Sequence, residues 1–231
     1  YIYFARPDSH IDGVSVYGSR IKAGKFLAMD SSVEADLVTG VPESGNAAAL
    51  GYSLQSGIPY GTAFVKNGYV GRTFIKPKQS SRESSVRIKL NVLKEAVAGK
   101  RVVMIDDSIV RGTQLRETTE FLYHSGAKEV HIRPACPPLV YGCKFLNFSR
   151  SSSELDLITR RIIQEREGDN PSAETLQDYA DPDSQNYAEM VEEIRKRLNF
   201  TSLRFHRLDD LVESIGLPKC KLCTYCWDGK E

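Results

Sequence analysis

The chain has 231 residues, of which 41% are hydrophobic and 26% are charged, and its formal net charge is +1. This composition is ordinary for a globular protein with a hydrophobic core, and the charge balance lacks the basic excess of a nucleic-acid-binding protein. No apolar run approaches the length of a membrane span, which argues against an integral membrane protein. The first ten residues contain neither Met nor a signal-peptide pattern. We therefore expect an upstream part that this chain lacks, with a missing leader as the alternative.

Short apolar stretches alternate with segments of helical composition along the first two thirds of the chain. The stretches that predict strands are residues 35–41, 58–66, 101–105 and 129–135. The segments that predict helices are residues 47–57, 89–99 and 114–126. Between residues 67 and 87 the sequence is polar and basic with Gly, Ser and Pro, which is typical of a long loop. This alternation predicts an α/β fold with a mainly parallel, twisted sheet flanked by helices.

The last third of the chain has a weaker pattern. Residues 153–170, 187–199 and 208–216 predict helices, and residues 201–207 predict a strand. Residues 170–186 are polar with two prolines and predict an exposed insertion. We expect one domain over residues 1–231, with a helical and polar insertion at about 151–190 and a Cys-rich tail at 220–231.

The most informative stretch is "RVVMIDDSIVRGTQ", residues 101–114. Asp106 and Asp107 follow an apolar strand, and in open α/β sheets ligands bind outside the carboxyl ends of strands. The residues after them lead into a helix, so their backbone N–H groups form an anion site. Ser108 and Thr113 add hydroxyls, and Arg111 adds charge. Gly112 lets the chain approach a ligand closely.

One turn thus offers amides that suit a phosphate and carboxylates that suit hydroxyls or a divalent cation. A ribose 5-phosphate satisfies both, and a diol or Mg²⁺ relieves the repulsion between Asp106 and Asp107. The alternative is a solvated helix start in which one Asp is the N-cap.

"VVMIDDSIVRGT" resembles the phosphoribosyl-pyrophosphate (PRPP) motif of type I phosphoribosyltransferases. The stretches "YFARPDSHIDG", "VTGVPESG", "VKNGYVGRTFIKP", "VRIKLNVL" and "EVHIRPACPPLVYGC" resemble, in the same order, the glutamine PRPP amidotransferase family. The resemblance resumes at "TSLRFHRLDDLVESIG" and "CKLCTYCWDGK". It covers only the phosphoribosyltransferase half of that family, without the N-terminal glutaminase domain.

The resemblance implies a type I phosphoribosyltransferase fold and a Mg²⁺-dependent enzyme of purine biosynthesis. That enzyme transfers the phosphoribosyl group of PRPP to ammonia and gives 5-phosphoribosylamine and pyrophosphate. It implies catalytic roles for Lys66, Arg72, Asp106 and Asp107. The substrate-binding residues that it implies are Pro42, Glu43, Ser44, Gly45, Lys66, Asn67, Arg72, Asp106, Asp107, Ser108, Ile109, Val110, Arg111, Gly112 and Thr113. Asp106 and Asp107 would hold Mg²⁺, with Ser44 as a further ligand.

Two glycines depart from the family pattern. Gly45 stands where many members have Ser or Thr, and Gly68 stands where the family usually has Arg. Tyr3, Arg6, Asp8 and Ser9 match a stretch that lies near the active site in the family, and a polar surface turn is the alternative for them. The four histidines have no nucleophile–base spacing, so we assign them to structure or surface.

The chain has five cysteines, three of them at Cys-x-x-Cys-x-x-Cys spacing. This pattern argues against a secreted disulfide scaffold and suggests a metal in a reducing cytoplasm. By resemblance, Cys143, Cys223 and Cys226 correspond to ligands of a [4Fe–4S] cluster, the fourth being upstream of this chain. Cys220 is a substitute for that ligand, zinc is the alternative metal, and Cys136 is assigned to the core.

The resemblance also implies partners: a glutaminase domain or subunit in the parent protein, and further copies of the chain in a homo-oligomer. We expect no nucleic-acid or membrane partner, and a cytoplasmic location. Two other functions are considered. One is a PRPP-sensing module that has lost catalysis. The other is a nucleobase salvage transferase, for which "PPLVYGC" offers no obvious base-binding hood.

Overall fold

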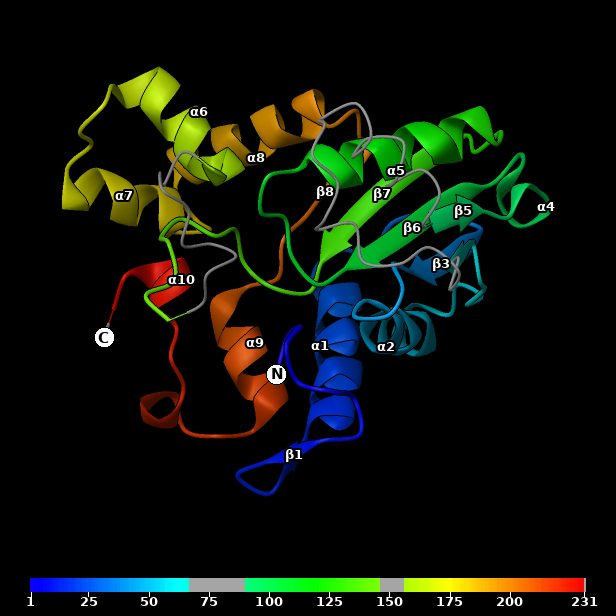
Figure 1. Cartoon of the computed structure of the whole chain (residues 1–231), viewed down its shortest axis with the longest axis horizontal. Helices are drawn as coiled ribbons and strands as arrows, with labels where there is room; N and C mark the ends of the chain where they lie inside the picture. The colour runs from blue at the N-terminus through cyan, green and yellow to red at the C-terminus, as the bar shows by residue number, and fades with distance from the viewer. Residues whose placement is uncertain (67–89, 146–155, 231) are drawn as a thin grey trace, which may run out of the picture.

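The computed structural model describes residues 1–66, 90–145 and 156–230. Its centre is a four-stranded sheet in the order β3 (Leu37–Gly40), β6 (Arg101–Asp106), β7 (Glu129–Pro134), β8 (Ser202–Leu203). All three neighbouring pairs are parallel. The α/β class and the parallel sheet expected from the sequence are therefore confirmed (Figure 1).

Helices cover both faces of this sheet (Figure 1). On one face lie α1 (Val16–Asp30) and α2 (Asn46–Ser56). On the other lie α5 (Thr113–His124), α6 (Ile158–Glu167) and α8 (Gln185–Arg197). The described residues also form α4 (Lys94–Val97), α7 (Ala173–Ala180), α9 (Leu208–Ile215), α10 (Tyr225–Asp228) and a short 3-10 helix, Lys219–Lys221.

Alternation along β6 builds the two cores. Val102 and Met104 pack into the cluster that contains residues of α5, α6 and α8. Val103 and Ile105 pack into the cluster with residues of α1 and α2. A parallel strand that is buried on both faces reads as a continuous apolar run, which is why "VVMI" predicted it.

The described residues also form two antiparallel strand pairs. β1 (His10–Ile11) pairs with β2 (Val14–Ser15), and β4 (Phe64–Lys66) pairs with β5 (Leu90–Val92). β5 corrects the sequence prediction of one helix over residues 89–99. Leu90 and Val92 alternate toward the core while Asn91 is exposed, so this part forms a strand and only α4 is helical.

The predicted exposed insertion at 170–186 is also wrong in part. Ser172 accepts a hydrogen bond from the Thr175 backbone N–H and begins α7. Tyr179 of α7 is 0% exposed and donates a hydrogen bond to Glu167 at the end of α6. The segment is therefore anchored to the main core through Tyr179, while its other residues are exposed or half-buried.

The sequence pattern did not predict α1, the longest helix that the structure describes. Ser15 caps it by accepting a hydrogen bond from the Gly18 backbone N–H. Gly24 allows close packing on α2, because a Cβ there would lie 1.9 Å from the Ala48 carbonyl oxygen.

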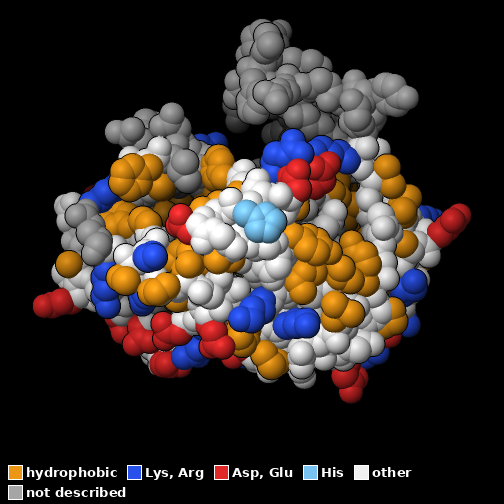
Figure 2. All heavy atoms as spheres, turned by 90° about the horizontal axis from the view of Figure 1, so that it is seen from below, with side chains coloured by type: hydrophobic (Ala, Val, Ile, Leu, Met, Phe, Trp, Pro, Cys, Tyr) orange, Lys and Arg blue, Asp and Glu red, His pale blue; other side chains and the backbone are white. Residues whose placement is uncertain are grey.

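Within the described residues, no helix has the length and apolar content needed to cross a membrane. Figure 2 shows hydrophobic side chains gathered on the face that lies below in Figure 1.

Candidate active site

The acidic turn leaves the carboxyl end of β6. Asp106 Oδ1 accepts a hydrogen bond from the Asp107 backbone N–H at 2.8 Å, and Asp107 Oδ1 accepts one from the Ser108 hydroxyl at 2.7 Å. Gly112 has φ +79° and stands at the N-cap of α5. A residue with a side chain is strained at such a φ, so glycine is what lets the turn enter the helix here.

The second turn leaves β3, the neighbour of β6. The Val41 backbone N–H donates to the Ile105 carbonyl at 2.8 Å, which ties the two turns together. A Cβ at Gly45 would lie 2.3 Å from the same Ile105 oxygen. The close approach therefore accounts for glycine at this position, one of the two departures from the resembled family.

The two turns enclose a cavity of about 520 Å³. Its lining includes Pro42 and Ser44 of the turn after β3 and every residue from Asp106 to Leu115. Tyr3 and Phe4, from the start of the chain, form another wall. Ten of the residues expected from the sequence thus face one space: Pro42, Ser44, Asp106, Asp107, Ser108, Ile109, Val110, Arg111, Gly112 and Thr113.

The carboxylate pair is electrostatically strained. Burial raises the pKa of Asp106, and the neighbouring charge of Asp107 raises it further. Asp106 is nevertheless accessible from the cavity that it lines. A bound cation or a pair of hydroxyl donors would relieve this strain, so the residues fit a divalent metal or a diol.

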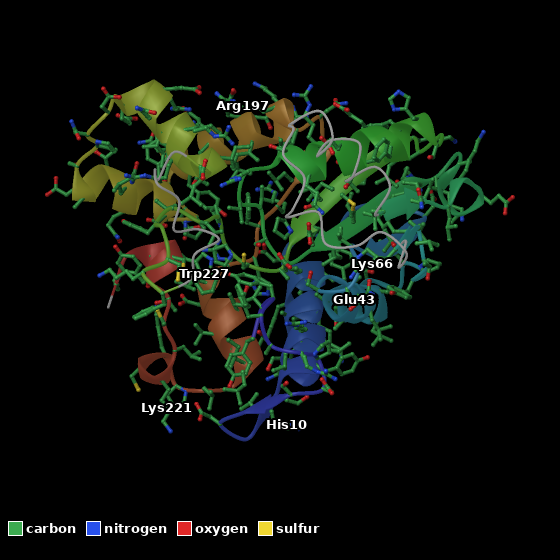
Figure 3. All side chains as sticks on the ribbon, viewed as in Figure 1. His10, Glu43, Lys66, Arg197, Lys221 and Trp227 are labelled. Carbon is green, nitrogen blue, oxygen red and sulfur yellow. The ribbon has the colours of Figure 1, made fainter. Side chains whose placement is uncertain are left out.

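Some expected residues lie elsewhere. Glu43 and Lys66 do not line the cavity. The Lys66 ammonium lies 3.6 Å from the Glu43 carboxylate, and both side chains are exposed (Figure 3). Gly45 is buried behind the wall. Asn67 and Arg72 lie outside the described residues.

Arg111 lines the cavity, but its guanidinium is already engaged. One of its nitrogens lies 2.5 Å from Asp156 Oδ2, and its carbonyl accepts a hydrogen bond from Arg161. The positive charge of Arg111, which we expected to bind the ligand, is therefore partly neutralised by Asp156, just before α6.

Comparison with known proteins identifies the family. No protein-family model matches the chain. Amidophosphoribosyltransferases from Mycobacterium tuberculosis and Bacillus subtilis are each 42% identical over all of this chain, which spans 39% and 43% of their lengths. The enzyme of the same name from Archaeoglobus fulgidus is 56% identical over 155 residues, 67% of this chain and 34% of its own length. The chain belongs to the amidophosphoribosyltransferase family. It spans about two fifths of the length of the curated members that it matches over its full length.

Solved structures agree with this family assignment. One described as the allosteric regulatory enzyme of purine biosynthesis has a TM-score of 0.78 and 41% identity over 99% of this chain. The B. subtilis glutamine PRPP amidotransferase complexed with ADP and GMP has a TM-score of 0.77 and 42% identity, also over 99%. The chain covers 44% and 45% of those chains.

The N-terminal segment contributes Tyr3 to the cavity, one of four residues for which the sequence left a surface turn as the alternative. Tyr3 lies in the cavity wall, and burial together with nearby thiols and Asp107 raises its pKa. Arg6 and Asp8 form an exposed ion pair outside the cavity lining. The buried Arg20 of α1 holds this segment by donating to the Tyr1 and Ala5 carbonyls at 2.8 and 2.9 Å. No sequence signal pointed to Arg20, because its partners are backbone oxygens.

Two of the cysteines, Cys143 and Cys226, lie close to each other. The Cys226 and Cys143 thiols are hydrogen-bonded, and burial followed by the charge of Cys143 raises the pKa of Cys226 to about 12. Cys220 and Cys223 are exposed. Within residues 1–66, 90–145 and 156–230, no group of three or more His, Cys, Asp or Glu side chains could hold a metal ion. Two neighbouring thiols fit part of a thiolate site, but they do not complete a ligand set for a [4Fe–4S] cluster.

Proposed function

We propose that this chain binds PRPP in the cavity between the two turns and transfers its phosphoribosyl group to ammonia. The products are 5-phosphoribosylamine and pyrophosphate, as in the first step of purine biosynthesis. The observation that carries the proposal is the cavity itself, in which the adjacent carboxylates and the amide-rich start of α5 line one space. The carboxylates match the hydroxyls of a ribose 5-phosphate, and the backbone N–H groups match its phosphoryl group.

The roles follow from the chemistry of each group. The backbone N–H groups of residues 108–113, at the N-terminus of α5, bind the 5-phosphate. Asp106 and Asp107 accept hydrogen bonds from the ribose hydroxyls. The turn after β3, which includes Pro42 and Ser44, receives the pyrophosphate, and the exposed Lys66 adds a cation once its contact with Glu43 is released.

The reaction needs positioning and charge stabilisation more than a protein nucleophile. Pyrophosphate leaves from C1 as the ribose gains oxocarbenium character, and ammonia attacks the same carbon. Magnesium, when bound, neutralises charge on the pyrophosphate; Asp106, Asp107 and Ser44 are the residues that would hold it. Tyr3 and Phe4 cover the cavity on one side and exclude water, which competes with ammonia.

The test is ammonia-dependent release of pyrophosphate from PRPP by the purified chain, with magnesium at alkaline pH. The D106N/D107N double variant is the control, because it keeps the shape of the turn and removes both charges. We expect release from the unmodified chain and severely weakened PRPP binding by the variant. PRPP binding without release would favour the sensing module over the enzyme, and unimpaired binding by the double variant would refute the role of the turn.

We further propose a finer organisation for the parent protein. Residues 1–231 form one domain, ammonia comes from a glutaminase domain or subunit, and the cytoplasmic assembly is a homo-oligomer. The relatives are more than twice as long as this chain, which supports a further functional part in them. Analytical ultracentrifugation of the chain tests the oligomer, and a single monomer species would reject it.

For the Cys-rich tail we propose an iron–sulfur site built on Cys143 and Cys226, with Cys223 or Cys220 recruited from the exposed part. The contact between the first two thiols supports it, and no catalytic step depends on it. Iron and acid-labile sulfide are measured in anaerobically purified chain and in C226S. Stoichiometric zinc would favour the alternative metal, and absence of both metals would reject the site.

A further inference from the structure

Two aromatic residues at the start of the chain form one wall of the candidate active site. Tyr3 and Phe4 line the cavity, and their rings pack edge to face with centroids 5.2 Å apart. We call this pair the aromatic wall. Both residues precede the first strand, β1, and Figure 1 shows the start of the chain between α1 and α9. The position of the wall therefore depends on what ties this segment to the helices.

Arg20 of α1 holds the segment on both sides of the aromatic wall. Its Nε donates to the Tyr1 carbonyl at 2.8 Å, and its Nη2 donates to the Ala5 carbonyl at 2.9 Å. A guanidinium presents its N–H groups in a rigid planar fork, so it fixes both carbonyls relative to α1. Since the two acceptors bracket residues 3 and 4, the fork determines where the aromatic wall lies.

The surroundings of Arg20 are closely packed. The side chain is 5% exposed. Arg20 and Ser44 line a space of about 10 Å³ behind the candidate active site, which has room for one water at most. Ser44 also lines the active-site cavity itself. Arg20 thus stands behind two walls of that cavity, the turn after β3 and the aromatic wall.

The fork matters more than the charge at this contact, because both acceptors are neutral carbonyls. Burial lowers the pKa of Arg20, and the charge of Asp107 opposes this shift. The terminal ammonium of Tyr1 is repelled, since burial and then the charge of Arg20 lower its pKa. Hydrogen bonds rather than attraction between charges therefore hold the segment on α1.

Other contacts keep the segment on the protein when Arg20 is replaced. The Tyr1 hydroxyl donates to the Ile11 carbonyl at 2.8 Å. Ile2 packs against the buried cluster of Ala23, Cys136 and Leu211. Loss of the fork should therefore loosen residues 3–5 without detaching the whole segment.

We propose that Arg20 is a positioning residue that sets the partition of the reaction between ammonia and water by holding the aromatic wall over the cavity. This role rests on the proposed function. In both reactions the bond from C1 to the pyrophosphate oxygen breaks. Ammonia forms a C–N bond and gives 5-phosphoribosylamine, whereas water forms a C–O bond and gives ribose 5-phosphate; each nucleophile gives up one proton. Since both attack the same carbon, access of water decides the partition.

The experiment measures pyrophosphate release from PRPP by the full 231-residue chain with magnesium, with and without saturating ammonium, at constant ionic strength. Release without ammonium reports attack by water. The ratio of the two rates therefore reports the partition, and it does not depend on the fraction of folded protein. R20M should lower the ratio about tenfold, as expected when one or two hydrogen bonds are lost. R20K, which keeps the charge but not the fork, should lower it as well.

The matched control is R133M, which also removes a buried guanidinium. Arg133 is 3% exposed, donates to the Ser31 hydroxyl and the Ile132 carbonyl, and does not line the active-site cavity. R133M should leave the ratio unchanged. Y3A/F4A removes the aromatic wall itself and should lower the ratio, and adding R20M to it should have no further effect, because Arg20 acts through these two residues.

Three results would overturn the role of Arg20: an unchanged ratio in R20M, a ratio that falls equally in R133M, or a further fall when R20M is added to Y3A/F4A. An unchanged ratio in R20K beside a low ratio in R20M would assign the effect to charge and reject the fork. If the unmodified chain releases no pyrophosphate with ammonium, the proposed function fails, before any variant is compared, and this role fails with it.

Discussion

Replacing Asp106 by Asn should stabilise the protein and disable its proposed ligand site at the same time. Burial and the charge of Asp107 raise the pKa of Asp106. The native state therefore binds this proton more tightly than the unfolded chain does. It follows that stability is lost as pH rises from the ordinary range of Asp through the raised pKa.

The magnitude follows from the size of such a shift. Each pKa unit corresponds to about 1.4 kcal/mol, so even a shift of one unit predicts that D106N gains at least that much at pH 9. At pH 4 the wild-type carboxyl is largely protonated in the native state, and the difference should nearly vanish. Asn also keeps an oxygen that can accept the Asp107 N–H at the 2.8 Å position, so the substitution costs little in geometry.

The assay is urea unfolding of both proteins at pH 4 and pH 9, without magnesium or ligand. D209N is the matched control, because the Asp209 side chain is 94% exposed and the substitution changes the net charge equally. Because its 3.9 Å contact with Lys219 is exposed, D209N should change stability far less than D106N does at pH 9. If D106N is no more stable than the wild type at pH 9, the acidic pair is not strained and the reason given for its affinity for cations and diols fails.

Three further predictions test the framework around the site. G45A places a Cβ about 2.3 Å from the Ile105 carbonyl oxygen; we expect a loss of roughly 1–3 kcal/mol in urea unfolding and weaker PRPP binding by calorimetry, and unchanged values would show that the turn can move. The Arg101 guanidinium lowers the pKa of Asp36 to about 2, so D36N should lower the melting temperature at pH 7 but not at pH 2; an equal effect at both would contradict this pairing. Y179A should cost about 3–5 kcal/mol in urea unfolding, whereas a cost near zero would restore the exposed insertion expected from the sequence.

The sequence predicted the sheet better than it predicted the periphery. The strand at residues 101–105 was identified because both faces of β6 are buried, which leaves an uninterrupted apolar run. The helix expected over residues 89–99 was wrong in its first half, because alternation over only three residues, Leu90–Val92, carries too little signal against a following helical composition. Boundaries of short elements depend on pairing partners that periodicity does not show.

The same limit explains why the sequence did not predict α1. In α1 the buried face includes Ser19, Arg20 and Gly24, so polar and apolar residues do not separate along the helix. Arg20 is buried because backbone carbonyls of the N-terminal segment accept its hydrogen bonds. These partners lie far away in sequence and are not typical of any motif. Burial of a polar residue by tertiary contacts is what single-sequence reasoning could not predict.

The candidate site itself followed from one property of parallel sheets. Residues that end neighbouring strands meet at the same edge, however far apart they lie in the chain. Gly40 is in register with Ile105, so the turn that begins at Val41 must lie beside the turn that begins at Asp106. From the sequence, the role of the turn after β3 rested on the family resemblance, and the register now gives the physical reason why the two turns meet. The sequence could not predict that Gly45 has to be small for them to touch, since that requirement comes from one carbonyl oxygen of the neighbouring strand. The glycine by which this chain departs from the family pattern is, in the folded chain, the residue that lets the turn after β3 lie against the Ile105 carbonyl oxygen.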